Sequence, residues 1–263
     1  MKWSGGTMKF DVLDRMMRVF ETSADLCVLP GMFMVARLDG RHFTRLTKEE
    51  GNFEVPFDVR FRDWMVSTTE ALMHCGFRVL YGFTESDEIS LLLHPDEQAF
   101  GRKLRKYNST LAAEASAHFS LKLGKVATFD CRISQLPGPQ KVVDYFRWRS
   151  EDASRNALNS WCYWTLRDQG ESRRGATQQL NGLATSRKRE LLRYYGIEFD
   201  QLPAWQRRGV GLYWKRFARK GTNPQTGDQV GTFRRSVYVE YELPSQAEYS
   251  WLIQQLLAPA LTT

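Results

Sequence analysis

Two short acidic segments could do phosphate chemistry. Asp39-Gly40 follows one apolar run, and Asp87-Glu88 lies between two further apolar runs. Carboxylates that meet with no cation between them repel each other, so a converging pair favours a bound metal ion. Magnesium prefers oxygen ligands and keeps water and substrate phosphates in its shell. Two such ions can stabilise the attacking and leaving oxygens of a displacement at phosphorus.

The residues that follow Asp39 favour a phosphate ligand. Gly40 lets the backbone approach closely, and the segment 41–44 supplies main-chain N–H groups and a guanidinium at a turn or helix start. Each feature also has an ordinary structural explanation, because Asp-Gly turns and acidic hairpin tips are common. Whether they form a metal and phosphate site or are only ordinary turns depends on whether the fold brings them together.

The elements that must position these acids follow from hydrophobic periodicity. The expected order is strand, helix, strand, strand, helix, strand, which is the α+β, ferredoxin-like arrangement of a polymerase palm. In that antiparallel sheet the first and third strands are central neighbours, so Asp39 and Asp87 converge. The expected strands of the palm are 32–38, 77–82, 89–94 and 125–135, and its expected helices are 58–75 and 96–122. A short helix over 11–22 is expected before them.

After Pro139 the chain becomes helical and basic, with expected helices over 140–168 and 172–195 and a late strand over 232–242. We expect residues 1–7 to be a leader or disordered, 8–139 to form the catalytic palm, and 140–263 to pack on the palm and bind RNA.

The positive charge is concentrated in the second half of the chain. Residues 141–220 hold 17 Lys and Arg against 8 Asp and Glu, within a net charge of +7 for the chain. A basic segment with interleaved aromatic residues suits a nucleic acid, although a solvated basic face has the same composition. The RNA-binding candidates by position are Arg147, Arg149, Lys188, Arg207 and Arg208.

Composition argues against several other classes. No apolar stretch is long enough to span a membrane, and residues 1–11 lack the apolar segment of a secretion signal. The four cysteines form no Cys-x-x-Cys pair, which argues against a zinc ribbon and against a disulfide framework. We therefore expect a cytoplasmic protein with no membrane contact.

An ordered set of motifs resembles the tRNA-His guanylyltransferase superfamily, and particularly its Thg1-like branch. The matching segments run from one end of the chain to the other. They are Arg37-Leu38-Asp39-Gly40-Arg41-His42-Phe43, Tyr81-Gly82-Phe83-Thr84-Glu85-Ser86-Asp87-Glu88, Phe129-Asp130-Cys131-Arg132, Tyr145-Phe146-Arg147-Trp148-Arg149 and Leu180-Asn181-Gly182-Leu183.

The resemblance implies a palm that adds nucleotides to the 5′ end of tRNA, in the 3′-to-5′ direction. It implies two Mg²⁺ ions on Asp39, Asp87 and the Gly40 carbonyl, with Glu88 supporting the site. The substrates implied are tRNA, GTP and ATP, and the assembly implied is a homotetramer. The nucleotide-binding residues carried over are Arg37, Gly40, Arg41, His42, Phe43, Thr44 and Ser86.

One departure from the family pattern bears on the reaction. Enzymes that add a guanylate to tRNA-His carry a His-Ile-Asn-Asn-x-x-Asn stretch in the region where this chain has Asp152-Ala153-Ser154-Arg155-Asn156-Ala157-Leu158-Asn159. This departure is similar to the branch that repairs 5′-truncated tRNA on a template, so template-dependent repair is the primary prediction and guanylate addition to tRNA-His is the alternative. A palm-type nucleotide cyclase lacks support because its Gly-Gly-Asp/Glu-Glu-Phe hairpin is absent. A non-catalytic RNA-binding module is the remaining reading.

Overall fold

The computed structural model describes residues 9–47, 53–222 and 229–261. The expected leader over residues 1–7 lies outside these ranges. All neighbouring strands are antiparallel in one six-stranded sheet of order β4-β1-β3-β2-β5-β6. The strands are β1 Phe33–Gly40, β2 Val79–Glu85, β3 Glu88–Leu93, β4 Phe129–Leu136, β5 Val210–Thr222 and β6 Gln229–Glu240.

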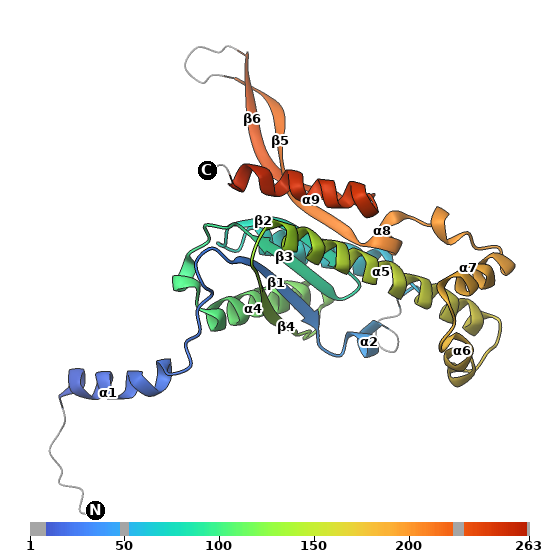
Figure 1. Cartoon of the computed structure of the whole chain (residues 1–263), viewed down its shortest axis with the longest axis horizontal. Coiled ribbons are helices and arrows are strands. Elements are labelled where there is room, and N and C mark those ends of the chain that lie inside the picture. The colour runs from blue at the N-terminus through green and yellow to red at the C-terminus, as the bar shows by residue number, and fades with distance from the viewer. Residues whose placement is uncertain (1–8, 48–52, 223–228, 262–263) are drawn as a thin grey trace, which may run out of the picture.

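The first four strands and two helices form the predicted palm. Helices α3 (Val59–Met73) and α4 (Leu104–Leu123) cover one face of the sheet. Side chains alternate along β1, so Met34 and Leu38 pack under these helices whereas Val35 points into the core on the opposite face. Both faces of the central strands are therefore buried, which explains the continuous apolar run in β1 (Figure 1).

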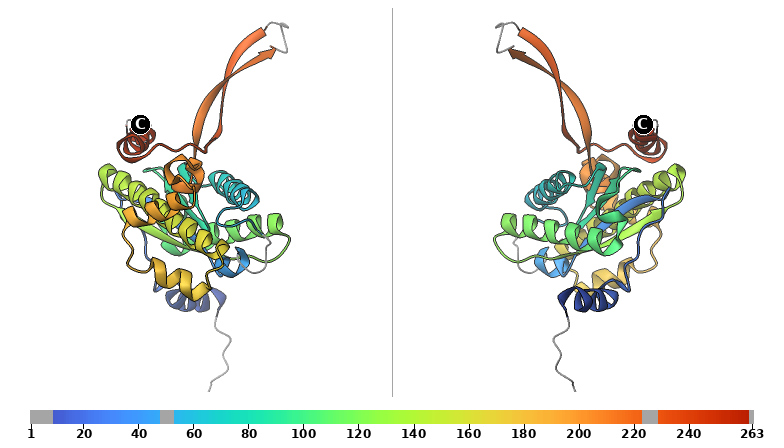
Figure 2. Two further views of the ribbon diagram at one scale, coloured as in Figure 1. Left: turned by 90° about the vertical axis from the view of Figure 1, so that its right-hand side faces the viewer. Right: turned by 90° about the vertical axis from the view of Figure 1, so that its left-hand side faces the viewer.

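The second face is covered by α5 (Pro139–Asp168) and α9 (Gln246–Leu261). Tyr81 of β2 reaches into this layer, where its ring packs on Phe146 and its hydroxyl lies 3.0 Å from that of Tyr249. The C-terminal segment thus completes the palm rather than lying beside it. Two views at right angles to the first show the resulting three layers (Figure 2).

The far half of α5 carries a smaller cluster of helices. Leu192, Phe199 and Leu158 pack together there in a third apolar core. The elements are α6 Arg173–Leu180, α7 Thr185–Tyr194, α8 Ala204–Arg208 and the 3-10 turn η3 Phe199–Gln201. In the part of the chain that the structure describes, no helix is long and apolar enough to cross a bilayer.

Three expectations differ from the structure. The helix expected over 172–195 is two helices, α6 and α7, with Gly182 between them at a left-handed φ of 72°. The helix expected from residue 96 begins at Leu104, because Phe100 and Gly101 have left-handed φ angles of 54° and 61° within the 3-10 turn η2 (Ala99–Arg102). The basic segment expected to be helical also contributes β5, which pairs with β2 from Val210↔Thr84 to Tyr213↔Tyr81. Beyond Tyr213 the two strands β5 and β6 leave the body as a two-stranded ribbon (Figure 2).

Two elements near the start of the chain stand apart from these layers. Helix α1 (Phe10–Thr22) buries none of its side chains in the described structure, and Figure 1 shows it projecting from the body. Helix α2 is a single turn, Phe43–Arg45, directly after β1. It brings the Phe43 ring into the core against Phe119 and Phe129, with ring centroids 5.0 Å apart in both pairs.

Candidate active site

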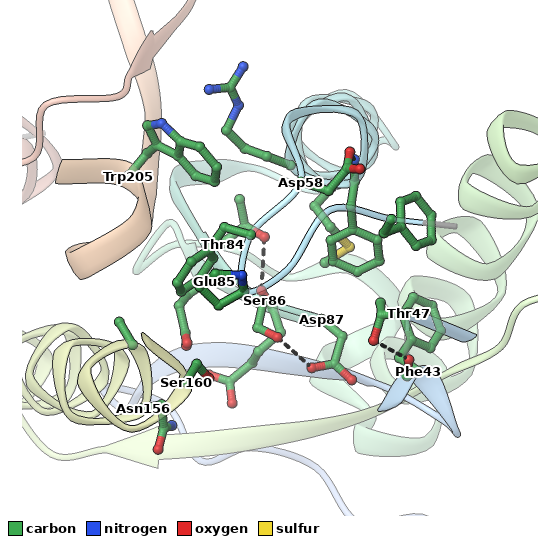
Figure 3. Close-up of a pocket in the computed structure, with 18 of the residues that line it drawn as sticks. Phe43, Thr47, Asp58, Thr84, Glu85, Ser86, Asp87, Asn156, Ser160 and Trp205 are labelled. Carbon is green, nitrogen blue, oxygen red and sulfur yellow. Dashed lines mark hydrogen bonds between the residues drawn. The ribbon is translucent and has the colours of Figure 1, made fainter. Parts of the chain in front are cut away.

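The structure brings Asp39 and Asp87 to the same edge of the sheet. Asp39 at the end of β1 is in register with Glu88 at the start of β3, and the Gly40 amide donates to the Asp87 carbonyl at 3.0 Å. Asp87 lies in the two-residue turn between β2 and β3, and Ser86 before it takes a φ of 50°. The Ser86 hydroxyl donates to Asp87 Oδ1 at 3.2 Å (Figure 3).

The electrostatics of this edge favour a bound cation. Burial raises the pKa of Asp87, and the charge of Asp39 raises it further. Burial also raises the pKa of Glu85 to about 8, with a smaller effect from Glu88. Carboxylates that are buried and repel each other are stabilised as anions when a positive charge binds between them. The donor set therefore suits a hard divalent cation that takes oxygen ligands.

Glu88 is held differently from these acids. Arg149 of α5 binds it with both guanidinium arms, Nε to Oε1 at 2.7 Å and Nη2 to Oε2 at 2.9 Å, and Arg37 Nε lies 2.9 Å from Oε2. Burial raises the pKa of Glu88, whereas these two cations lower it. Glu88 is thus paired with two arginines, whereas neither Asp39 nor Asp87 has an arginine partner among the described residues.

The same contacts correct one RNA-binding candidate. Arg149 is only 5% exposed, and its Nη1 also lies 3.3 Å from Asp152. A guanidinium with this burial and these partners is part of the site's support and is not presented to RNA. Its place in a basic segment gave no signal of this, because the partner Glu88 is 61 residues away in the chain.

A cavity of about 670 Å³ opens beside the acids. Of the candidates named from the sequence, those that line it are Arg37, Asp39, Phe43, Thr44, Ser86, Asp87, Glu88 and Arg149. Gly40, Arg41 and His42 are not among its lining residues. The Arg41 amide donates to the Thr128 carbonyl at 2.8 Å, so it is not available to a phosphate in the expected anion cradle.

Phe43 and Gly40 have a packing role that the motif did not indicate. Phe43 is 2% exposed, as a core residue. A Cβ on Gly40 would lie 2.5 Å from its ring. The close approach of the Phe43 ring therefore requires a glycine at position 40. The Gly40 carbonyl is the group of this residue that we propose as a metal ligand.

The cavity has a wall that sequence reasoning missed. Asn156, Asn159 and Ser160 project from α5, at a spacing that puts them on one helix face, and Figure 3 shows Asn156 and Ser160 opposite Asp87. Aromatic side chains also line the cavity: Phe53, Phe57, Trp164 and Trp205. Aromatic faces and amide groups are the side chains that stack on and hydrogen-bond a nucleobase. The polar i, i+3, i+4 spacing on α5 was the available signal.

The other RNA-binding candidates lie outside this cavity. Arg147 is exposed and pairs with Glu151 at 2.6 Å. Arg207 and Arg208 are partly buried, and each donates its Nε to a main-chain carbonyl, of Leu202 at 2.7 Å and of Leu243 at 2.8 Å. Lys188 is partly buried on α7. These four remain predictions.

The geometry fits a metal that is completed by its substrate. Among the described residues, no three His, Cys, Asp or Glu side chains are grouped as a ready-made metal site. Magnesium is bound in many phosphoryl-transfer sites by one or two carboxylates together with substrate phosphates and water. A pair of carboxylates beside an open cavity matches that mode.

An antiparallel palm with paired acids where its two central strands meet defines a nucleotidyltransferase. Residues 14–137 match the family described as Thg1, tRNAHis guanylyltransferase, and residues 140–244 match the Thg1 C terminal domain. The chain therefore belongs to the tRNA-His guanylyltransferase family and is a nucleotidyltransferase.

Individual relatives agree with this assignment. A probable tRNA(His) guanylyltransferase of Drosophila melanogaster is 30% identical over 73% of this chain and 70% of its own length. Its counterpart in Mus musculus is 30% identical over 76% and 70%. Among solved structures, a bacterial tRNA(His) guanylyltransferase (Thg1)-like protein in complex with GTP superposes with a TM-score of 0.71 at 25% identity, over 94% of this chain and 99% of that one.

Proposed function

We propose that this protein adds a nucleotide to the 5′ end of tRNA, with a nucleoside triphosphate as donor and two Mg²⁺ ions bound by Asp39, Asp87 and the Gly40 carbonyl. The observation that carries the proposal is the convergence of Asp39 and Asp87 at the mouth of a 670 Å³ cavity walled by aromatic and amide side chains. The relatives' shared name and the GTP held by the bacterial neighbour support the substrates.

Each residue at the site has a separate role in this proposal. Asp39 and Asp87 would hold the metal, which would offset the charge on the reacting phosphates and favour the nucleophilic form of the attacking hydroxyl. Arg37 and Arg149 hold Glu88, the first residue of β3, in place beside Asp87. Thr44 and Ser86 lie on the cavity wall where a triphosphate would run, with Arg41 and His42 on the turn that precedes Thr44.

The proposed displacement joins the incoming nucleotide to the RNA through its 3′-hydroxyl. That oxygen bonds to the activated 5′ phosphorus, the bond to pyrophosphate or AMP breaks, and the hydroxyl proton leaves to solvent. Either ATP or GTP can serve as the activating nucleotide in this scheme. The aromatic wall at Phe53, Phe57 and Trp205 offers the stacking surface for the incoming base.

The identity of the added nucleotide separates two forms of the proposal. The names of the relatives favour guanylate addition to tRNA-His over the template-dependent repair that the sequence pattern favoured. Repair stays the second candidate because Asp152, which stands where the family has a histidine, lines the cavity and lies 3.3 Å from Arg149.

A 5′-end extension assay distinguishes these forms. Full-length tRNA-His and a tRNA that lacks its first nucleotide are each incubated with one labelled nucleoside triphosphate at a time, GTP, ATP, CTP or UTP, with and without Mg²⁺. Guanylate addition extends only the first, opposite a non-pairing 3′ base, whereas repair extends the second with whichever nucleotide pairs. Extension of neither, with Mg²⁺ and all four triphosphates present, would overturn the proposal.

Two further inferences concern the state of the protein. All four cysteines are free in the structure, which suits the reducing cytoplasm. We also infer that the chain self-assembles, as the predicted homotetramer implies. The support is α1, which exposes seven apolar side chains to solvent: Phe10, Val12, Leu13, Met16, Met17, Val19 and Phe20. An unpartnered apolar face of this size is typical of a protein interface.

A further inference from the structure

A second cavity, of about 790 Å³, lies at the foot of the β5–β6 ribbon. Five of its lining side chains are cationic or can become so, and none of the described residues that line it is Asp or Glu. The five are Arg78, His94, Lys215, Arg216 and Arg235. Uncharged residues from the end of α3 and from α9 complete its walls.

Two of these cations are placed against each other. Arg216 of β5 and Arg235 of β6 are directly opposite in the strand register, so their side chains lie on the same face of the ribbon. Like charges in directly opposed positions destabilise a strand pair. Within the described residues, no carboxylate forms an ion pair with Arg78, Arg216 or Arg235. An anion bound between the two arginines would remove this repulsion.

The cavity is held in shape before any ligand arrives. Trp214 donates its Nε1 hydrogen to the Val79 carbonyl at 2.8 Å, and the Arg235 guanidinium lies 4.7 Å from the Trp214 ring. Arg78 Nη2 lies 3.2 Å from His94 Nε2. Burial lowers the pKa of His94, and the charge of Arg78 lowers it further, as expected where positive charge accumulates.

Strand β2 connects this cavity to the active site. Val79 at its start lines the basic cavity, whereas Thr84 and Glu85 at its end line the first cavity. The strand rises about 3.3 Å per residue, so the two cavities are roughly 20 Å apart. Strand β5 runs in the opposite direction, from Val210 beside the active site to the cations of the ribbon.

We propose that the basic cavity and the base of the ribbon bind the phosphate backbone of the RNA substrate, about 20 Å from the 5′ end that occupies the active site. This inference rests on the proposed function, because it assigns a second contact to the same RNA. An RNA backbone is favoured over a single free phosphate compound because the positive charge extends to a further exposed arginine of the ribbon, Arg234. Residues 214–236 contain six Lys and Arg and one Asp.

The distance between the two cavities predicts how long an RNA must be to reach the basic cavity. Phosphates follow one another at about 3.4 Å along the axis of a duplex, so the contact falls roughly six nucleotides from the reacting end. Binding is measured by fluorescence anisotropy between 50 and 200 mM salt on two RNAs, a whole tRNA and a hairpin of four base pairs with the same 5′ end. The variants are Arg216→Ala/Arg235→Ala, the charge-preserving Arg216→Lys/Arg235→Lys, and Lys122→Ala on α4 as an exposed control.

The alanine pair should weaken tRNA binding about tenfold and flatten the slope of log affinity against log salt by about two. The lysine pair and Lys122→Ala should keep the wild-type slope, and binding of the four-base-pair hairpin should be the same in every variant. In turnover, the alanine pair should raise the KM for tRNA and leave kcat at saturating RNA within about twofold.

Three outcomes overturn the inference. Unchanged salt slopes for the alanine pair would remove the RNA contact. Weakened binding of free GTP or ATP would make the cavity a second nucleotide site, and a change in mass by light scattering would make it an interface between copies of the chain. If wild-type protein binds no tRNA, the proposed function fails instead, so the two failures are separate. The single variant Arg216→Ala serves as the test should the double variant unfold, because Arg216 is exposed and stacks on no ring in the described structure.

Discussion

Arg149 binds both carboxylate oxygens of Glu88, at 2.7 and 2.9 Å, across a separation of 61 residues. This contact ties α5 to the sheet edge at the position next to Asp87. It also removes one carboxylate from the electrostatics of the active site. The function of the basic segment is thus partly internal, since one of its arginines supports the catalytic edge.

Breaking this pair from one side should be costly. Arg149→Met leaves the carboxylate of Glu88 buried with one cation fewer, and we expect the free energy of unfolding to fall by about 3–5 kcal/mol in urea titrations. The double variant Arg149→Met/Glu88→Gln should recover most of that loss. The control is Arg147→Met on the same helix, whose exposed pair with Glu151 should contribute less than about 1 kcal/mol. Equal losses for both arginines would contradict a special role for Arg149.

Asp87→Asn should separate metal binding from folding. In the absence of Mg²⁺ the variant should be at least as stable as the wild type, because it removes a buried carboxylate that Asp39 repels. Saturating Mg²⁺ with GTP should raise the melting temperature of the wild type and leave that of the variant unchanged. Nucleotide addition should fall by roughly a hundredfold or more.

The matched control for Asp87→Asn is Asp130→Asn. Asp130 is a register neighbour of Asp39 on β4, but it is exposed and pairs with Arg132 at 3.5 Å. This variant should keep both the Mg²⁺ effect and the activity. Loss of activity in Asp130→Asn would place a third acid in the metal site.

Asp58 should make stability depend on pH at the acidic end. Burial opposes its ionisation, but hydrogen bonds from Arg60 and from the amides of Glu54 and Phe61 outweigh it and lower the pKa of Asp58 to about 2. A depressed folded-state pKa stabilises the fold above the unfolded value of about 4, and this contribution is lost as pH falls from about 4 to about 2. Asp58→Ala should lower the free energy of unfolding by about 1–2 kcal/mol at pH 7.

The difference between Asp58→Ala and wild type should shrink as pH falls through that window. Asp58→Asn, which can still cap the first turn of α3, should lose less at pH 7. A difference that stays constant from pH 7 to pH 2 would show that the carboxylate charge has no part in the cap.

Gly40→Ala tests the close approach of Phe43. The added methyl group would lie 2.5 Å from the ring, so the turn or the core must shift, at a cost of about 1–3 kcal/mol in unfolding free energy. Gly231→Ala, whose Cβ meets nothing within 4 Å, is the control and should be neutral. If both variants unfold at the same urea concentration, the space argument for Gly40 is wrong.

Charged substitutions in the exposed apolar face of helix α1 should disrupt self-assembly of the chain. Leu13→Glu/Met17→Glu places two charges in its exposed apolar face, and we expect light scattering to show a smaller particle than the wild type. The control Arg15→Glu/Arg18→Glu changes the exposed polar face and should leave the mass unchanged. A wild-type protein that is already monomeric would contradict self-assembly.

Most of the palm could be predicted because its signals are local. The apolar run before Asp39, the helical stripe after Asp58 and the short strands on either side of Asp87 each depend on neighbouring residues. The antiparallel order of these strands then follows from connection rules, and it brings Asp39 to Asp87. Strand β5 was missed because its cations, such as Lys215 and Arg216, indicate a nucleic-acid surface as readily as a strand of a ribbon.

The sequence by itself determined the family, the palm and the pair of acids that meet in it, since motifs and periodicity are properties of adjacent residues. Only the tertiary structure decided which charges are free to act. Arg149 is paired with Glu88, the Arg41 amide donates to the Thr128 carbonyl, and Arg216 faces Arg235 with no carboxylate partner among the residues that the structure describes. The physical reason is that the effect of a charge depends on its burial and on its nearest neighbours in space, and those neighbours come from distant parts of the chain.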